Sequence, residues 1–346
     1  MRLRDVCMLA AVAALTAGAA QRPQPSTGTT AGLRGLSAVG ESVVWASGTG
    51  GTFVRSVDGG ATWQVGAVPG AESLDFRDVE AFGAETAYLL SIGRGESSRI
   101  YKTSDGGKNW TLQFKNADPD VFLDAMAFWD AEHGLVLGDP VRGRFLILAT
   151  DDGGKTWAPA PPEGMPPALP GEAAFAASGT CIAASGARHV WFGTGGAAAR
   201  VFRSTDRGRT WSVAETPVTS GAESAGIFSV AFRDERHGVA VGGDYRRPEA
   251  AEKNAAVTDD GGRTWRLLEK SRPAGYRSGV AWARGRGAQA LIAVGTSGAD
   301  YSMNGGADWV GVDRENSYST SFGAAGAGWV SGPGGRIARI PVPPPR

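Results

Sequence analysis

Three motifs in the sequence have residue types that could perform metal, nucleotide or hydrolase chemistry. His133, His189 and His237 are the only histidines, and no cysteine accompanies them at zinc-site spacing. The run GTGGAA at residues 193–198 resembles a dinucleotide fingerprint, but a strand follows it, so no helix N-terminus would meet a phosphate. The run GTSGA at residues 295–299 lacks the last glycine of a nucleophile elbow. We therefore expect no metal, no cofactor and no serine hydrolase.

Polar and aromatic side chains also gather in several predicted loops, where they could bind a ligand or a partner. An arginine beside a tyrosine offers carboxylate pairing together with aromatic contact area, and both are features of binding surfaces. The alternative is solvated loop charge with local Asp–Arg pairing, which contributes little energy. The sequence leaves both interpretations open. The candidate binding residues are Asp139, Arg142, Glu172, Asp244, Tyr245, Arg246, Tyr276, Arg277, Asp300 and Tyr301.

A repeated eight-residue phrase indicates which elements must position these residues. It occurs six times, and the tryptophan-to-tryptophan steps are 47, 47, 54, 54 and 44 residues. One supersecondary unit that recurs at this period predicts a repeat architecture. We name each copy a repeat turn. The copies are SVDGGATW at 56–63, TSDGGKNW at 103–110, TDDGGKTW at 150–157, STDRGRTW at 204–211, TDDGGRTW at 258–265 and SMNGGADW at 302–309.

Each repeat turn has the composition of a tight turn held by its own side chains. The Asp or Asn can accept bonds from nearby backbone N–H groups, and glycine supplies positive φ. The tryptophan opens the next strand with a large apolar ring. We predict structural roles, with the six tryptophans buried in equivalent places, for Asp58, Asp105, Asp152, Asp206, Asp260, Asn304, Trp63, Trp110, Trp157, Trp211, Trp265 and Trp309.

Between the repeat turns, each unit shows the pattern of four short strands. Residues 78–82, 86–91, 99–103 and 110–114 show this pattern once, and 52 glycines supply the necessary turns. Four-stranded units of this period are typical of β-propeller blades. We therefore predict an all-β fold.

The end of the chain indicates the number of blades. Residues 329–340 match residues 45–56 at six of twelve positions, and no repeat turn follows them. We predict a seven-bladed β-propeller of four-stranded antiparallel blades, with a six-bladed ring as the alternative. The last blade then needs a fourth strand from elsewhere, which we expect residues 22–32 to supply.

The N-terminus has the features of a secretory signal peptide. Arg2 and Arg4 precede an apolar run over residues 6–17, which is too short for a stable membrane span. We expect export to the periplasm or the cell exterior, with Cys181 left alone and no disulfide. The predicted organisation is a signal peptide over 1–20, a tether or closing strand over 21–32, the propeller over 33–340 and a proline-rich tail over 341–346.

A family resemblance adds functional expectations. The repeat turns resemble Asp-box (BNR) repeats, and the unit pattern over about residues 33–340 is similar to the photosystem II stability/assembly factor-like propellers, with distant similarity to sialidases. The first likeness implies an exported, non-catalytic scaffold that binds a protein or peptide. The second implies a sialidase-like glycoside hydrolase or a glycan-binding propeller, which is the alternative.

The residues favour the scaffold over the hydrolase. The sialidase likeness implies an arginine trio, a tyrosine nucleophile with a glutamate, and an Arg-Ile-Pro phrase ahead of the first repeat. Here that phrase stands at residues 339–341, after the last repeat, and the nearest tyrosine–glutamate pair is Tyr318 with Glu315. Lys and Arg total 35 and Asp and Glu total 35, so no basic field favours nucleic acid. We expect a monomer with a protein or peptide partner, and a glycan is the alternative partner.

Chain topology predicts where a site would lie. Successive turns of an antiparallel meander alternate between its two ends. The repeat turns and the turns after first strands therefore share one face of the ring. The turns after second strands and the links between blades share the opposite face. Function is disproportionately carried by loops, and the candidate binding residues fall in this second set. We expect the binding surface on the face opposite the repeat turns.

Overall fold

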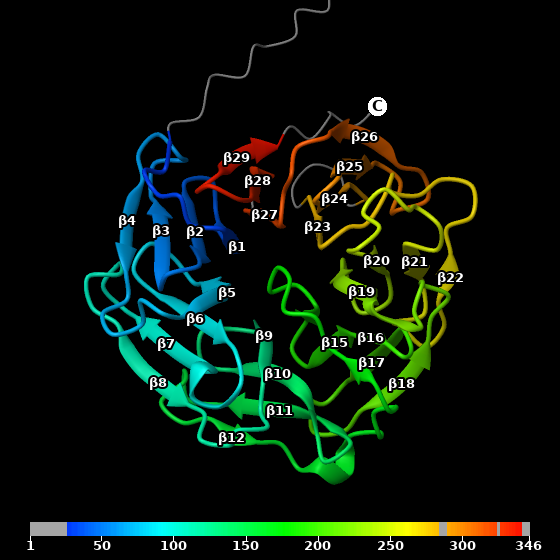
Figure 1. Ribbon diagram of the computed structural model, residues 1–346, viewed down its shortest axis with the longest axis horizontal. Coiled ribbons are helices and arrows are strands. Elements are labelled where there is room, and N and C mark those ends of the chain that lie inside the picture. Colours follow the sequence, from blue (N-terminus) through cyan, green and yellow to red (C-terminus); the bar gives the residue numbers. More distant parts are fainter. Residues whose placement is uncertain (1–25, 284–288, 324–325, 341–346) are drawn as a thin grey trace, which may run out of the picture.

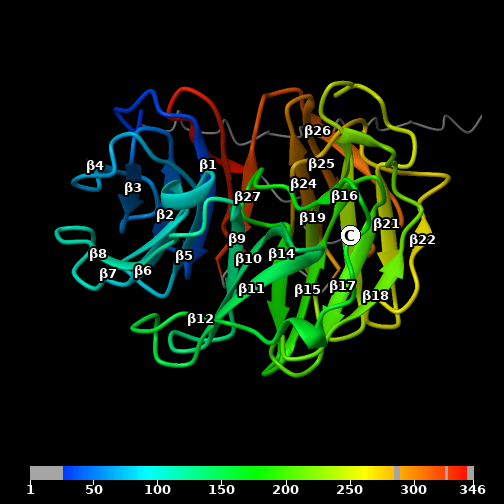
Figure 2. The same cartoon turned by 60° about the horizontal axis from the view of Figure 1, so that its bottom comes forward.

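The computed structural model describes residues 26–283, 289–323 and 326–340. Its strands form seven antiparallel sheets arranged as a ring, in which the first and last sheets are neighbours (Figure 1). Figure 2 shows the strands running between the two faces of the ring. The predicted seven-bladed β-propeller is confirmed, and the six-bladed alternative is wrong. The predicted signal peptide, residues 1–20, and the tail, residues 341–346, lie outside the described residues.

The blades follow one another in chain order, and we number them from the N-terminus. Blade 1 contains β1 (Leu33–Val39), β2 (Val43–Gly48), β3 (Thr52–Ser56) and β4 (Gln64–Ala67). Blade 2 contains β5 (Asp75–Ala81), β6 (Ala87–Ile92), β7 (Arg99–Thr103) and β8 (Thr111–Lys115). Blade 3 contains β9 (Leu123–Phe128), β10 (Gly134–Val141), β11 (Arg144–Thr150) and β12 (Ala158–Pro159). Blade 4 contains β14 (Ile182–Ser185), β15 (His189–Gly193), β17 (Arg200–Ser204) and β18 (Ser212–Glu215).

The second half of the ring repeats this order with two variations. Blade 5 contains β19 (Ala222–Phe232), β20 (Gly238–Asp244), β21 (Ala255–Thr258) and β22 (Arg266–Leu267), and the short β16 (Gly195–Gly196) and β13 (Glu172–Ala173) extend its sheet. Blade 6 contains β23 (Gly279–Trp282), β24 (Leu291–Gly295), β25 (Gly298–Ser302) and β26 (Val310–Asp313). In the part of the chain that the structure describes, blade 7 has three strands, β27 (Ser319–Phe322), β28 (Gly328–Ser331) and β29 (Ile337–Ile340). Within the described residues, the helical content is two 3-10 turns, η1 (Gly95–Ser97) and η2 (Pro162–Gly164).

The first strand is the inner edge of every blade except blade 5, where β16 pairs with the beginning of β19, and side chains satisfy part of these edges. Ser37 Oγ accepts a hydrogen bond from the Ala81 N–H of the next blade at 3.1 Å. Three equivalent bonds follow the same pattern, in which the backbone N–H donates to a side-chain oxygen of the neighbouring blade. They join Met126 N–H to Asp78 (2.7 Å), Val280 N–H to Ser229 (3.0 Å) and Ala38 N–H to Ser321 (3.0 Å). These bonds join neighbouring inner strands because an unpaired buried N–H is costly.

All six repeat turns lie between the third and fourth strands of their blades and share one hydrogen-bond pattern. The leading Ser or Thr hydroxyl accepts the N–H four residues on at 2.8–3.0 Å. The Asp or Asn Oδ1 accepts another N–H four residues on at 2.9–3.0 Å. Hydrogen bonds from the residue four positions on lower the pKa of Asp58, Asp105 and Asp152 to about 2.

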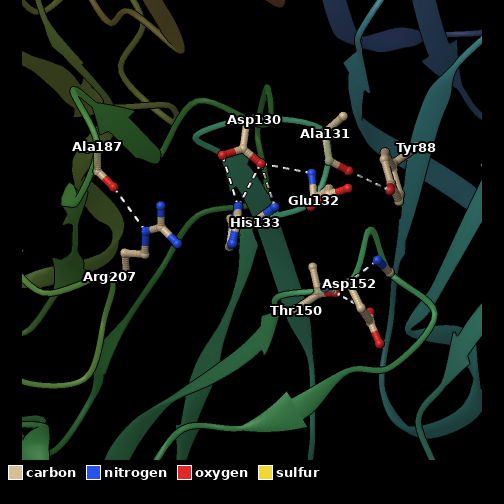
Figure 3. A network of polar contacts seen from close by, with 10 residues as sticks. Tyr88, Asp130, Ala131, Glu132, His133, Thr150, Asp152, Ala187 and Arg207 are labelled. Atoms are coloured by element: carbon tan, nitrogen blue, oxygen red, sulfur yellow. Dashed lines mark hydrogen bonds and ion pairs between the residues drawn. The ribbon is translucent and has the colours of Figure 1, made fainter.

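The repeat turns pack on the turns that follow the first strands, which places both sets on one face. In each of the six turns the N–H after the Asp or Asn donates to a carbonyl of that neighbouring turn, at 2.8–3.0 Å. Figure 3 shows this face at blades 2 to 4, where Tyr88 donates to the Ala131 carbonyl and Arg207 to the Ala187 carbonyl. The alternation of faces expected from the topology is therefore present.

The six repeat-turn tryptophans are not equally buried, contrary to our prediction. Trp211 and Trp309 are 9% and 8% exposed, and their indole N–H groups donate to the Gly208 and Gly306 carbonyls. Trp63, Trp110, Trp157 and Trp265 are half-buried, and their indole N–H groups have no hydrogen-bond partner among the described residues.

The second strand of the preceding blade explains this difference. We call the contact between two neighbouring blades a seam. Where the second strand places Leu135 against the repeat turn of the next blade, Trp211 of that turn is buried in the seam. Val239 has the same position relative to Trp309, which is also buried. At the other four seams the same register position holds a large ring, and the tryptophan stays half-buried. Those rings are Trp329 before Trp63, Trp45 before Trp110, Tyr88 before Trp157 and Trp191 before Trp265.

The N-terminal segment crosses blade 7 at the turn between β28 and β29. Thr27 Oγ1 donates to the Gly335 carbonyl at 2.7 Å, and the Gly335 N–H donates to the Ala31 carbonyl at 2.7 Å. Gly335 has φ +72, and a Cβ there would overlap the Thr29 carbonyl oxygen. Residues 26–32 therefore join the chain ends as a link between blades. They contain no strand, contrary to our expectation for residues 22–32, of which residues 22–25 lie outside the described residues.

None of the helices in the described part of the chain is long and apolar enough to pass through a bilayer.

We predict that Trp211→Ala destabilises the fold by about 3–5 kcal/mol, as removal of a large buried aromatic does. Trp63→Ala should cost less, because its ring is half-buried and its N–H already lacks a partner. Chemical denaturation of both variants measures the difference. Equal losses would contradict our account of the two classes of seam.

We predict that Gly335→Ala lowers the unfolding free energy more than Gly334→Ala does. Both glycines have positive φ, but a Cβ at Gly334 has nothing within 4 Å. Gly334→Ala therefore measures the conformational cost alone, about 1 kcal/mol. The additional loss of unfolding free energy in Gly335→Ala measures how much the contact with residues 26–32 stabilises the ring. If the two variants melt at the same temperature, the crossing segment does not stabilise the ring.

Candidate functional site

The structure divides the ten predicted binding residues into three groups. Eight lie at the ends of second strands, in the turns that follow them or in links between blades, as the topology required. Asp300 lies in the third strand β25, but its side chain bonds back to the link before β23. Tyr301 directly precedes Ser302, the first residue of a repeat turn, so it lies toward the opposite face. Our placement of Tyr301 was wrong, because β25 runs from one face of the ring to the other within five residues and Tyr301 lies near its repeat-turn end.

Three of these residues form buried ion pairs that hold the links in place. Glu172 is 4% exposed and pairs with Arg200, whose Nε donates to Glu172 Oε1 at 2.9 Å. Arg277 is 1% exposed and donates from Nε to Asp300 Oδ2 at 2.7 Å. The remaining acceptor sites of Glu172 are also used, by the Thr194 hydroxyl and by a backbone N–H. These groups are therefore structural and not available to a partner.

The accessible members of the predicted set lie on loops of blades 3 and 5. Arg142 and Arg246 are exposed, and Tyr245 is 45% exposed. Asp244 caps its own loop by accepting the Arg246 N–H at 2.9 Å. Asp139 is half-buried beside a groove of about 380 Å³, and its Oδ1 accepts the Ala174 N–H at 3.0 Å. Binding by this set remains a prediction.

Two arginines near the axis were missed by our sequence reasoning. Arg34 on β1 and Arg77 on β5 occupy the same position in blades 1 and 2, where each inner strand has a β-bulge. Arg34 lies over the Tyr318 ring with its Cζ 4.0 Å from the ring centroid. Arg77 Nε pairs with Asp75 Oδ2 at 2.8 Å. Burial and the Arg77 charge lower the pKa of Arg34, so the two guanidinium groups lie close enough to repel.

Arg34 has an unusual balance of partners. Its Nη1 donates to the Ala177 carbonyl at 3.1 Å, and no carboxylate lies within ion-pair distance of it in the described part of the chain. A guanidinium has five N–H donors, and one protein bond uses only one of them. Arg34 can therefore accept an anionic group from outside.

Aromatic rings from blades 5 and 6 complete this central region. Phe228, the residue at the β19 bulge, stacks on Phe175 at 3.9 Å and meets the edge of Tyr276 at 4.8 Å. Tyr245 approaches Phe228 edge-on at 6.1 Å. Burial raises the pKa of Tyr276, and Arg34 and Arg77 act in the opposite direction. We name Arg34, Arg77, Tyr245, Tyr276 and Tyr318 the axial surface.

The link between blades 3 and 4 closes the axis beneath this surface. We name residues 173–181 the plug, and Figure 1 shows this green segment reaching the centre of the ring. Arg34 and Arg77 donate to the Ala177 and Ala176 carbonyls, at 3.1 and 2.9 Å. Ser178 donates to the Ser278 carbonyl at 2.6 Å. The plug is thus held by blades 1, 2 and 6.

The opposite end of the axis remains open on the repeat-turn face. A cavity of about 820 Å³ there is lined by the later halves of the inner strands, including Ser37, Glu80, Arg233 and Ser321. In the described part of the chain, no group of three or more His, Cys, Asp or Glu residues is placed to hold a metal. The two ends of the axis therefore differ, since the plug separates an Arg–Tyr surface from an open funnel.

No protein-family model matches the sequence, and no curated protein matches it. Solved structures match the fold over most of the chain. YCF48 bound to D1 peptide has a TM-score of 0.66 and 17% identity, covering 92% of this chain and 96% of that chain. The Pan2 WD40 domain of Neurospora crassa has a TM-score of 0.59 and 12% identity, covering 88% and 86%. U3-55K has a TM-score of 0.59 and 14% identity, covering 90% and 93%. At these identities the likeness establishes a propeller fold.

We predict that Glu172→Gln destabilises the fold by about 3–5 kcal/mol, because it leaves Arg200 buried with a neutral partner. Arg142→Ala, an exposed change on the same face, should stay within about 0.5 kcal/mol of wild type. Thermal melts of the two variants provide the comparison. If Glu172→Gln leaves the stability unchanged, Glu172 returns to the set of candidate binding groups.

Proposed function

We propose that this chain is a peptide-binding propeller whose partner binds the axial surface. The observation that carries the proposal is Arg34, a half-buried guanidinium near the axis with no carboxylate partner among the described residues. Charge-assisted bonds from arginine favour a carboxylate, and Tyr245 and Tyr318 offer contact area beside it. The partner is therefore a peptide segment with an acidic side chain or a free C-terminal carboxylate.

Two further observations support a binding scaffold. The matched YCF48 structure contains a D1 peptide, and this chain shares the propeller fold over most of its length. The repeat turns resemble Asp-box repeats, and their polar side chains are hydrogen-bonded to the backbone of the same turn. We therefore assign these side chains a structural role and place the binding site elsewhere. On this proposal the chain is non-catalytic and exported, as the signal-like residues 1–20 indicate.

The sialidase-like alternative has less support. Tyr318, its best nucleophile candidate, lies under the Arg34 guanidinium, and no hydrogen bond joins it to Glu315 in the described residues. A hydrolase would need that pair to act together. A screen with fluorogenic glycosides tests the alternative directly, because turnover by the purified chain would establish an enzyme.

The test of peptide binding uses an array of acidic peptides, each with a free C-terminus and with an amidated one, alongside capture from the native envelope fraction. Arg34→Ala should weaken the best peptide about tenfold or more, since a hydrogen bond to a charged group is worth about 1.5–3 kcal/mol. Arg209→Ala, an exposed arginine in a repeat turn on the opposite face, is the matched control. Fluorescence anisotropy measures both affinities. Unchanged binding by the Arg34 variant would place the partner elsewhere.

A further inference from the structure

Two carboxyl groups are buried against the plug without a cation. Asp78 and Asp124 are 4% and 1% exposed, and neither has a Lys, Arg or His partner within ion-pair distance in the described chain. Both lie on inner strands, β5 and β9, and Asp78 lies against Gly179 of the plug. A buried carboxylate with no cation is costly, so such a group holds its proton.

Asp78 touches the plug backbone directly. Gly179 has φ +74, and a Cβ on it would overlap the Asp78 carboxyl. The Asp78 carboxyl also accepts the Met126 N–H, at Oδ2 and 2.7 Å. The charged neighbour of Asp78 is Glu80 on the same strand, and its charge opposes ionisation of Asp78.

Asp124 lies close enough to Cys181, at the end of the plug, for its charge to raise the pKa of that thiol. Its Oδ2 is buried and has no hydrogen-bond partner among the described residues. The titratable groups that act on it are Asp139, which opposes its ionisation, and Arg77, which favours it. The thiol of Cys181 at the plug terminus feels both Asp124 and Asp78. Asp139 itself accepts the plug N–H of Ala174.

We propose that the plug is a proton-dependent gate of the axial surface, closed while Asp78 and Asp124 carry protons and released when they ionise. Burial raises the pKa of both carboxyls well above their ordinary value. The closed state therefore binds more protons than a state in which they meet water. By linkage its stability is greatest at low pH and falls as pH rises.

Gate opening has a consequence for the axial surface. The Ala177 and Ala176 carbonyls each hold one N–H of Arg34 and Arg77, which fixes both guanidinium groups. Release of the plug removes this support. The effect on peptide affinity rests on the proposed function, whereas gate opening itself does not.

Hydrogen exchange of residues 173–181 measures the gate without any ligand. Wild type is compared at pH 5.5 and pH 8.5 after correction for the intrinsic exchange rate. We expect exchange to rise with pH, by up to about tenfold per pH unit for each proton released. Asp78→Asn/Asp124→Asn mimics the protonated state and should keep the plug protected at both pH values. Asp151→Asn, an exposed carboxylate in a repeat turn on the opposite face, should behave as wild type.

Cys181 gives an independent readout, because it is fully buried at the end of the plug. In a Cys7→Ser background its modification by a thiol reagent should be faster in wild type than in the double variant at pH 8.5. The charges of Asp78 and Asp124 raise the pKa of this thiol, so their removal alone would speed modification of the variant. Faster modification of wild type therefore reports opening of the plug. Asp124→Asn alone should give an intermediate rate, which keeps the test usable if the double variant fails to fold.

The outcomes separate the gate from the proposed function. Equal plug protection at pH 5.5 and pH 8.5 in wild type overturns the gate, whatever the peptide result. A pH response that persists in the Asn variants also overturns it, since other groups would then cause the change. A responsive plug with no peptide binding supports the gate and removes the proposed function.

Discussion

The free inner edge of each blade is the constraint on which the rest of the structure depends. Seven first strands surround the axis, and each leaves backbone groups without a strand partner on that side. Ser37, Asp78, Ser229 and Ser321 satisfy some of these groups by accepting an N–H from the next blade. The plug fills the axis where its backbone can be bonded by side chains of several blades. Polar chemistry at the centre thus arises first from the need to satisfy buried backbone.

The β-bulges convert this constraint into a candidate site. An extra residue in an inner strand re-aims a side chain, and bulges are frequent beside functional sites. In blades 1, 2 and 5 the bulge residues are Arg34, Arg77 and Phe228, and in blade 3 the bulge residue is Asp124. One backbone irregularity, repeated around the ring, therefore supplies the two cationic groups of the axial surface, the Phe228 ring that contacts its tyrosines, and a buried acid.

The sequence predicted the architecture because the repeat turns are local. Their hydrogen bonds join residues four positions apart, so spacing alone reveals them. The bulges were not predictable in this way, because an extra residue breaks the alternation that identifies strand faces. Glu172 looked like loop charge because its partner Arg200 lies 28 residues away, beyond a turn whose path the sequence does not specify. The burial of Trp211 depends on Leu135 of the preceding blade, which no local pattern shows.

Two sets of carboxyl groups give the molecule opposite responses to pH. Hydrogen bonds hold the pKa of Asp58, Asp105 and Asp152 in the repeat turns at about 2, so their contribution is present above their ordinary pKa and lost as pH falls toward 2. Burial shifts Asp78 and Asp124 in the other direction, so their contribution is lost as pH rises. The first set lies at the periphery of each blade and the second at the axis. Ionisation at the axis can therefore loosen the plug while the repeat turns continue to hold the blades, which separates a local change at the centre from unfolding of the ring.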